Sequence, residues 1–132
     1  MIIDAAFVDK FNELNAKIEE MSKDINSILD MYINKYLNVV YPDFRHYLKS
    51  FHMDNTRVYF EYEYYNSDSY GSGYSEESSS LKFSFFENPV AEIAELLEAH
   101  NEKEAKKRIQ IEENAKASKL RQLESLKKEL GL

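Results

Sequence analysis

The sequence contains no cysteine, and this absence excludes several kinds of chemistry at once. Disulfides, thiolate zinc sites and a cysteine nucleophile are all ruled out. A chain without disulfides suits a reducing compartment, so we expect a cytoplasmic protein. No apolar run approaches the ~18 residues of a membrane span, and Asp4 and Asp9 stand where a secretory signal would carry basic residues. We therefore expect neither a membrane segment nor a signal peptide.

Positive charge is scarce as well, since the 132-residue chain has a net charge of −7. An acidic protein is repelled by phosphate backbones, so direct binding to nucleic acid is not expected. Tryptophan is absent, but ten tyrosines and eight phenylalanines bring the aromatic content to 14%. This composition is typical of a globular protein, and the length predicts a single domain over residues 1–132.

Apolar residues in the first part of the chain recur every three or four positions. The mean spacing is 3.5 residues, which is typical of helices that pack at a shallow crossing angle. Asp4 can cap the start, and Pro42 ends the helix because it forces Tyr41 out of helical geometry. The pattern predicts a helix over 4–39, about 54 Å long. We call its apolar stripe the seam, and it comprises Phe7, Phe11, Leu14, Ile18, Met21, Ile25 and Ile28.

A compact domain of this length is only about 30 Å across, so the seam needs a partner along its length. That partner is either the C-terminal helix of the same chain or a helix from another molecule. The C-terminal helix has a polar middle that cannot match the whole seam. We therefore expect a homodimer, or a helical partner from another protein.

Two later segments alternate apolar and polar residues, as half-buried strands do. Residues 56–65 place Val58, Phe60, Tyr62 and Tyr64 on one face, and residues 79–86 are the predicted partner strand. We expect an antiparallel hairpin with a loop over 66–78. Residues 43–53 fit either a short helix or a third strand, and we favour the helix.

The C-terminal part of the sequence predicts a second long helix, over 88–130. Asn88 can cap it, Pro89 suits its first turn, and no further proline or glycine occurs before Gly131. Acidic residues dominate its start and basic residues its end, which complements the helix dipole. The predicted fold class is α+β: a long N-terminal helix, an antiparallel hairpin and a long C-terminal helix, with the helices able to pack as a coiled coil.

The hairpin and its loop combine tyrosine, serine, glycine and acidic residues. Tyrosine offers a broad amphipathic surface, while serine and glycine offer adaptable hydrogen bonds. The negative charge suits a basic protein partner, including one that itself binds nucleic acid. We predict a non-catalytic protein-binding module such as an inhibitor, adaptor or chaperone, with a composition typical of phages and low-GC bacteria. Its partner-binding residues would be Tyr59, Glu61, Glu63, Tyr65, Asp68, Tyr70, Tyr74, Glu76 and Glu77.

Three alternatives remain open at this point. The first is a structural coiled-coil element that assembles through the seam, with the loop incidental. The second is a calcium site, because the loop has the spacing of an EF-hand at Asn66, Asp68, Tyr70, Gly71 and Glu77. The third is a zinc site built on His46, His52 and a carboxylate, although their spacing matches no known zinc motif.

Catalysis finds little support in the sequence. Glu61 and Glu63 share a strand face, but paired carboxylates need a cleft that perturbs their pKa values before they can exchange protons with a substrate. No serine lies in a nucleophile elbow. We expect no enzymatic activity and no cofactor.

Overall fold

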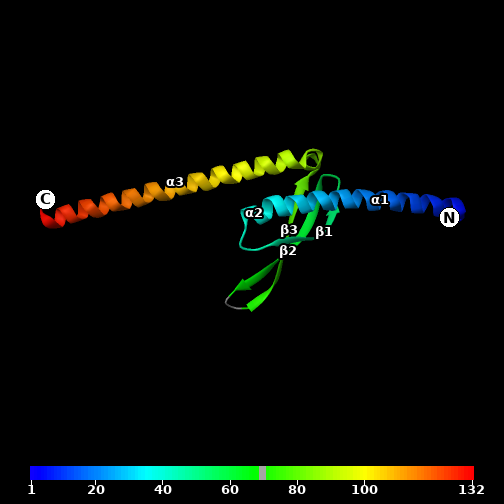
Figure 1. Ribbon diagram of the computed structural model, residues 1–132, viewed down its shortest axis with the longest axis horizontal. Helices are drawn as coiled ribbons and strands as arrows, with labels where there is room; N and C mark the ends of the chain where they lie inside the picture. Colours follow the sequence, from blue (N-terminus) through cyan, green and yellow to red (C-terminus); the bar gives the residue numbers. More distant parts are fainter. Residues whose placement is uncertain (69–70) are drawn as a thin grey trace. The chain divides into compact units, whose positions relative to one another are not determined.

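A computed structural model describes residues 1–68 and 71–132, and it describes the side chains of these residues outside 66–72. The chain divides into two compact units, Met1–Ala94 and Glu95–Leu132. The first unit holds the N-terminal helix and a three-stranded antiparallel sheet, and the second is helical throughout. The predicted α+β class, with long helices at both ends of the chain, is confirmed (Figure 1).

The N-terminal helix is unbroken but not uniform. It consists of α1 (Ala5–Tyr32), five residues of π-helix (η1, Ile33–Leu37) and a last turn, α2 (Asn38–Val40). The Asp4 carboxylate accepts a hydrogen bond of 2.9 Å from the Phe7 backbone N–H, as a capping residue should. The wider π-helical turn interrupts the regular helix that the sequence predicts over this stretch.

The three strands are β1 (His46–Met53), β2 (Arg57–Asp68) and β3 (Gly71–Lys82), in the spatial order β1-β2-β3. Residues 43–53 therefore contribute a strand, and the preference for a short helix was wrong. A β-bulge between Leu48 and Ser50 explains the error. The extra residue, Lys49, shifts the alternation of side chains by one position, so the segment lacks the two-residue period of a regular strand.

The hairpin differs from its predicted bounds. The ladder continues until Asp68 pairs with Gly71, so the predicted loop over 66–78 is mostly strand. The predicted strand over 79–86 was also wrong beyond Lys82, because Phe83–Glu87 forms a short 3₁₀ helix, η2. Serine-rich β3 has low intrinsic strand preference, and its pairing with the aromatic β2 outweighs that preference.

The core lies between one face of the sheet and the second half of the N-terminal helix, which crosses that face (Figure 1). Val58, Phe60 and Tyr62 alternate toward the helix and are buried, as predicted for this strand. The Tyr32 ring packs edge-on against both Phe60 and Phe85, with 5.7 Å between ring centroids in each case. The remaining buried apolar side chains of the core are Leu29, Ile33, Leu37, Leu81 and Ile93.

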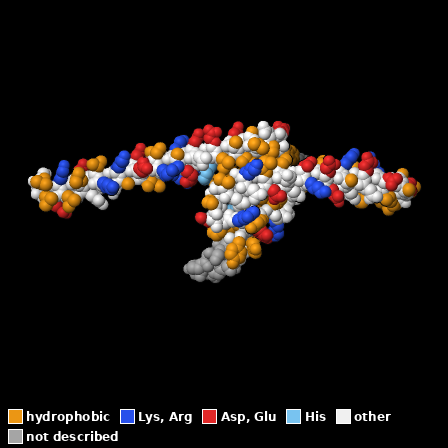
Figure 2. Space-filling view, viewed as in Figure 1, with side chains coloured by type: hydrophobic (Ala, Val, Ile, Leu, Met, Phe, Trp, Pro, Cys, Tyr) orange, Lys and Arg blue, Asp and Glu red, His pale blue; other side chains and the backbone are white. Residues whose placement is uncertain are grey.

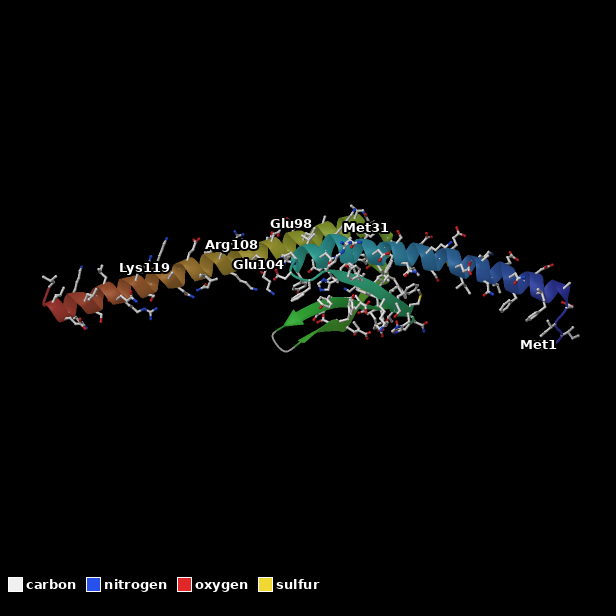
Figure 3. All side chains as sticks on the ribbon, turned by 60° about the horizontal axis from the view of Figure 1, so that its bottom comes forward. Met1, Met31, Glu98, Glu104, Arg108 and Lys119 are labelled. Atoms are coloured by element: carbon white, nitrogen blue, oxygen red, sulfur yellow. The ribbon has the colours of Figure 1, made fainter. Side chains whose placement is uncertain are left out.

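The first half of α1 extends past the sheet, with Met1 at its tip (Figure 3). Apolar side chains of the seam lie between charged ones on its surface (Figure 2). The large apolar side chains from Phe7 to Met21 are 39–57% exposed. Coiled-coil packing of the seam stays a prediction.

The second unit continues α3 (Pro89–Leu130), which begins in the first unit. Asn88 caps it, with a hydrogen bond of 3.4 Å from the Ala91 backbone N–H to the Asn88 side-chain oxygen. Lys127 and Lys128 lie in its last turn, where positive charge is favoured. None of the helices in the described residues combines the length and the hydropathy needed to cross a bilayer.

Candidate functional site

The strand register collects most of the predicted partner-binding residues on one face of the sheet. We call this the outer face, since α1 and η1 pack on the opposite side. Cross-strand pairing places Tyr59 beside His52 and Ser80, and Glu63 beside Tyr47 and Glu76. Six predicted residues therefore share the outer face, namely Tyr59, Glu61, Glu63, Tyr65, Tyr74 and Glu76.

Basic side chains neutralise the outer face. The Lys49 ammonium forms an ion pair with the Glu76 carboxylate from the bulge in β1, and this hydrogen bond raises the pKa of Lys49. Arg57 donates through Nε to the Ser80 hydroxyl at 2.8 Å. The register also pairs Arg57 with Lys82 on this face. Glu61, Glu63 and Glu76 are thus matched by Lys49, Arg57 and Lys82, so the outer face as a whole has no excess of acidic groups.

The outer face becomes aromatic toward the tip of the hairpin. The rings of Tyr65 and Tyr74 meet edge to face with 5.5 Å between centroids, and Tyr74 is 67% exposed. The backbone of Asp68 belongs to β2, but its side chain lies outside the described residues, as does all of Tyr70. The partner-binding roles of these two residues remain predictions.

Glu77 lies on the inner face and does not join the other predicted residues. Its register partner is Tyr62, whose side chain points toward the helix. The Glu77 carboxylate accepts hydrogen bonds from the hydroxyls of Tyr62 at 2.9 Å and Tyr64 at 3.3 Å. Burial and the bond to Glu77 raise the pKa of Tyr62.

Glu77 stands at the edge of a pocket of about 480 Å³ that the sequence does not reveal. We call it the tyrosine pocket. Tyr32 and Tyr36 are one helical turn apart, and their rings lie 5.3 Å from each other. Burial raises the pKa of Tyr32 to about 12, so this phenol stays neutral at physiological pH. The pocket is lined by Tyr32, Tyr36, Leu37, Tyr41, Phe44, His46, Tyr62, Tyr64 and Glu77.

His46 is hydrogen-bonded to Asn38 in this pocket. The Asn38 side-chain oxygen accepts the His46 backbone N–H at 2.6 Å and lies 3.1 Å from the ring nitrogen Nδ1. Because this oxygen can only accept, Nδ1 must carry the ring proton. Burial lowers the pKa of His46, and the imidazole is therefore neutral at pH 7.

The metal-site alternatives find no assembled ligand set in the part of the chain that the structure describes. His46 lies on the inner face of β1, whereas His52 lies on the outer face and stacks on Tyr59. The two histidines therefore cannot share one metal ion. Of the five EF-hand positions, Tyr70 lies outside the described residues, and the backbones of Asn66, Asp68 and Gly71 belong to the paired strands β2 and β3.

The seam ends in an apolar recess of about 350 Å³. Ile25 and Ile28 form its floor on α1 and are half-buried. The sheet contributes Met53 and Val58, and η2 contributes Phe83 and Phe86. Met21 and Asp24 complete the lining, so the recess is continuous with the exposed part of the seam.

Three surfaces of the Met1–Ala94 unit therefore stand out: the outer face, the tyrosine pocket, and the seam with its recess. Each presents exposed aromatic or aliphatic groups. No protein-family model matches the chain, and no curated protein or solved structure matches it either.

Proposed function

We propose that the protein is a non-catalytic association module that forms a homodimer through the α1 seam. The observation that carries this proposal is the exposure of Phe7, Phe11, Leu14, Ile18 and Met21, all on one helical face. A contiguous apolar stripe of this kind is uncommon on a monomeric protein. Covering it with a second helix would contribute roughly 1 kcal/mol for each half-exposed side chain.

The charges beside the seam favour an antiparallel pair of helices. Lys10, Lys17 and Asp24 each precede a seam residue and lie along one edge of it. In a parallel dimer these positions would face Asn15, Ser22 and Leu29, which offer no opposite charge. In an antiparallel dimer Lys10 faces Asp24 of the second copy, and symmetry repeats the pair. Lys17 then falls near the two-fold axis, and its ammonium lies 3.7 Å from Glu13 of its own helix.

The same register brings the two apolar features together. Leu14 packs opposite Ile18 of the second copy, and Phe11 packs opposite Met21. Phe7 reaches the level of Ile25, which lines the apolar recess. A phenylalanine ring entering the recess would cover Met53 and Phe83, both of which are exposed in the single chain. The seam and the recess thus form one continuous interface.

The dimer is tested by placing a charge in the middle of the seam. Ile18→Glu would bury a carboxylate in the interface, so we expect a shift from dimer to monomer at micromolar concentration. Val39→Glu is the matched control, because Val39 is an equally exposed apolar residue outside the seam. Sedimentation equilibrium measures both variants, and circular dichroism checks their folds. A wild-type protein that stays monomeric at high concentration would refute the proposal.

The direction of the helices is tested by disulfide cross-linking, which the absence of native cysteine makes unambiguous. An antiparallel pair brings residue 14 close to residue 18 of the second copy, within the narrow Cα separation that a disulfide allows. Oxidation of mixed Leu14→Cys and Ile18→Cys proteins should therefore give a covalent heterodimer. Efficient self-linking of either variant alone would indicate a parallel dimer instead.

A second candidate function is binding of a basic protein through the outer face. It rests on the exposed Tyr65 and Tyr74 pair, which shares the outer face with Glu61 and Glu63. A Glu61→Lys/Glu63→Lys variant should lose such a partner in capture from source cells. Glu77→Gln, on the inner face, is the control and should retain it. A partner captured equally by wild type and by the lysine variant does not use this face.

A further inference from the structure

The tyrosine pocket is lined mainly by aromatic side chains. Its rings come from the helix, from the connection between α2 and β1, and from β2. The Tyr64 ring centroid lies 5.6 Å from that of Phe44 and 5.1 Å from that of His46, and the Tyr41 ring lies 6.2 Å from His46. A concave site walled by several aromatic rings is suited to a ligand that contacts ring faces.

The pocket carries a single formal charge, which is negative. Among the residues that the structure describes, no lysine or arginine lies within ion-pairing distance of the Glu77 carboxylate. Burial lowers the pKa of His46 and so disfavours the imidazolium, while the bond to Asn38 only fixes which nitrogen of the neutral ring carries the proton. Nothing in the pocket therefore compensates Glu77, and the site favours a cation.

The type of cation follows from the hydrogen bonds of Glu77. One carboxylate oxygen already accepts from Tyr62 and the other from Tyr64. These two bonds occupy one lone pair on each oxygen, so a guanidinium group gains less from a bidentate contact here than it would at a free carboxylate. A quaternary ammonium group donates no hydrogen bond, and it needs only a nearby negative charge and aromatic faces.

We propose that the tyrosine pocket binds a quaternary ammonium group, with Tyr36, Tyr41, Phe44 and Tyr64 contacting its methyl groups and Glu77 balancing its charge. The pocket volume of about 480 Å³ lies within the range of small-molecule sites and exceeds the needs of the cationic group alone. The pocket therefore has room for further parts of a molecule that carries this group. A free quaternary amine and a trimethylated lysine side chain share this chemistry.

The test compares choline with 3,3-dimethylbutanol, which has the same shape but no charge. Titration is followed by calorimetry and by shifts of tyrosine ring signals in NMR spectra. We expect choline to bind at least tenfold more tightly than the neutral analogue, because only the cation gains from the ring faces and from Glu77. Equal binding of both probes, or no binding of choline at tens of millimolar, would overturn the proposal.

Two substitutions assign the site. Glu77→Gln and Tyr64→Leu should each weaken choline binding by roughly three- to thirtyfold. Glu63→Gln changes a carboxylate on the outer face, next to the Tyr64 position, and should leave binding unchanged. Circular dichroism checks that each variant is folded, and loss of affinity only in Glu63→Gln would place the site elsewhere.

The source of the cation is resolved by a peptide that carries trimethyl-lysine, titrated beside its unmodified counterpart. Tighter binding of the trimethylated peptide than of choline assigns the pocket to a methylated protein. Tighter binding of choline assigns it to a free amine, and both outcomes support the proposal. Equal affinity for the methylated and unmethylated peptides, at a level above that of choline, would contradict it. These titrations are independent of the dimer and can be repeated on the Ile18→Glu variant.

Discussion

Both halves of α1 carry a stripe of apolar residues, but only the second half packs against the sheet. In the second half, Leu29 is completely buried, and the Tyr32 ring packs against Phe60 and Phe85. In the first half, Phe11 and Ile18 are more than half exposed. Both halves belong to one unbroken helix. The difference in exposure therefore follows from what lies beside each half of the helix.

The apolar face also changes its width between the halves. The seam is narrow and repeats every 3.5 residues on average, a spacing that matches a second helix. The buried face continues through Leu29, Ile33 and Leu37, which are four residues apart, and it is widened by Tyr32 and Tyr36. A four-residue repeat turns gradually around the helix, and the π-helical turn of η1 lies within it. A wide face covers a sheet, whereas a narrow one suits a coiled coil.

The largest expected effect comes from truncating a leucine in each half. Leu29→Ala should lower the free energy of unfolding by ~2–5 kcal/mol, since it leaves a cavity in the core. Leu14→Ala should change it by no more than about 0.5 kcal/mol when both are measured in the monomeric Ile18→Glu background. Urea unfolding followed by circular dichroism gives both values. Comparable losses would mean that the first half of α1 is packed within its own chain.

Amide hydrogen exchange should separate the halves next. A helical segment of this length without packing is only marginally stable in water, so amides before residue 21 should exchange rapidly in the Ile18→Glu monomer. Amides of residues 29–37 should exchange slower by on the order of 100-fold or more, because they open only with the core. In the wild-type dimer the first half should gain protection. If the monomer protects both halves equally, the seam has a partner within the chain.

Acid should destabilise the packing around the second half of the N-terminal helix and leave the first half unaffected. Burial lowers the pKa of His46, so the unfolded chain binds more protons than the folded one below about pH 6.5. Stability should therefore fall as the pH drops from 6.5 toward the lowered pKa. Asp54 stays ionised throughout this range, because hydrogen bonds from the backbone N–H groups of Thr56 and Arg57 lower its pKa.

The control for this prediction depends on where the histidines lie in the chain. Since α1 contains no histidine, the dissociation constant of the dimer should stay constant between pH 7.5 and 5.5 when it is measured by sedimentation. This range spans the usual histidine pKa of about 6.5. His46→Gln should flatten the pH dependence of the unfolding free energy. An unchanged slope in that variant would assign the effect to another group.

Local patterns explain why much of this fold is predictable from the sequence. The spacing of the seam, the Asp4 cap and the alternation of Val58, Phe60 and Tyr62 each depend on neighbours within one element. Which face of the sheet Glu77 lies on depends instead on the register of the hairpin. The prediction of a loop over 66–78 did not define that register. The pairing of Asp68 with Gly71 sets that register and places Glu77 on the inner face, beside Tyr62.

The tyrosine pocket shows what sequence patterns cannot supply. Its walls come from four separated segments, around Tyr36, His46, Tyr64 and Glu77, and none of them carries a recognisable motif. The bulge at Lys49 also breaks the alternation of side chains, so the sequence did not predict β1, the strand that carries His46. Only the packing of the helix on the sheet brings these aromatic groups to one place, so the site depends on contacts that are distant in sequence.

The smallest expected effect tests the register of the dimer through its charges. Lys10→Glu should weaken the dimer, because each new carboxylate faces Asp24 of the second copy. An exposed ion pair contributes ~0.2–1 kcal/mol, and two symmetric pairs correspond to a roughly two- to thirtyfold change in the dissociation constant. Asp24→Lys should have a similar effect, and the double variant Lys10→Glu/Asp24→Lys should restore the wild-type value.

High salt provides a further check, since screening should shrink the difference between the single variants and wild type. Restoration by the double variant requires the two positions to face each other across the interface. A parallel dimer, which places Lys10 near Asn15, would show no such recovery. A double variant weaker than both single variants would therefore exclude the antiparallel register, and with it the entry of Phe7 into the recess beside Ile25.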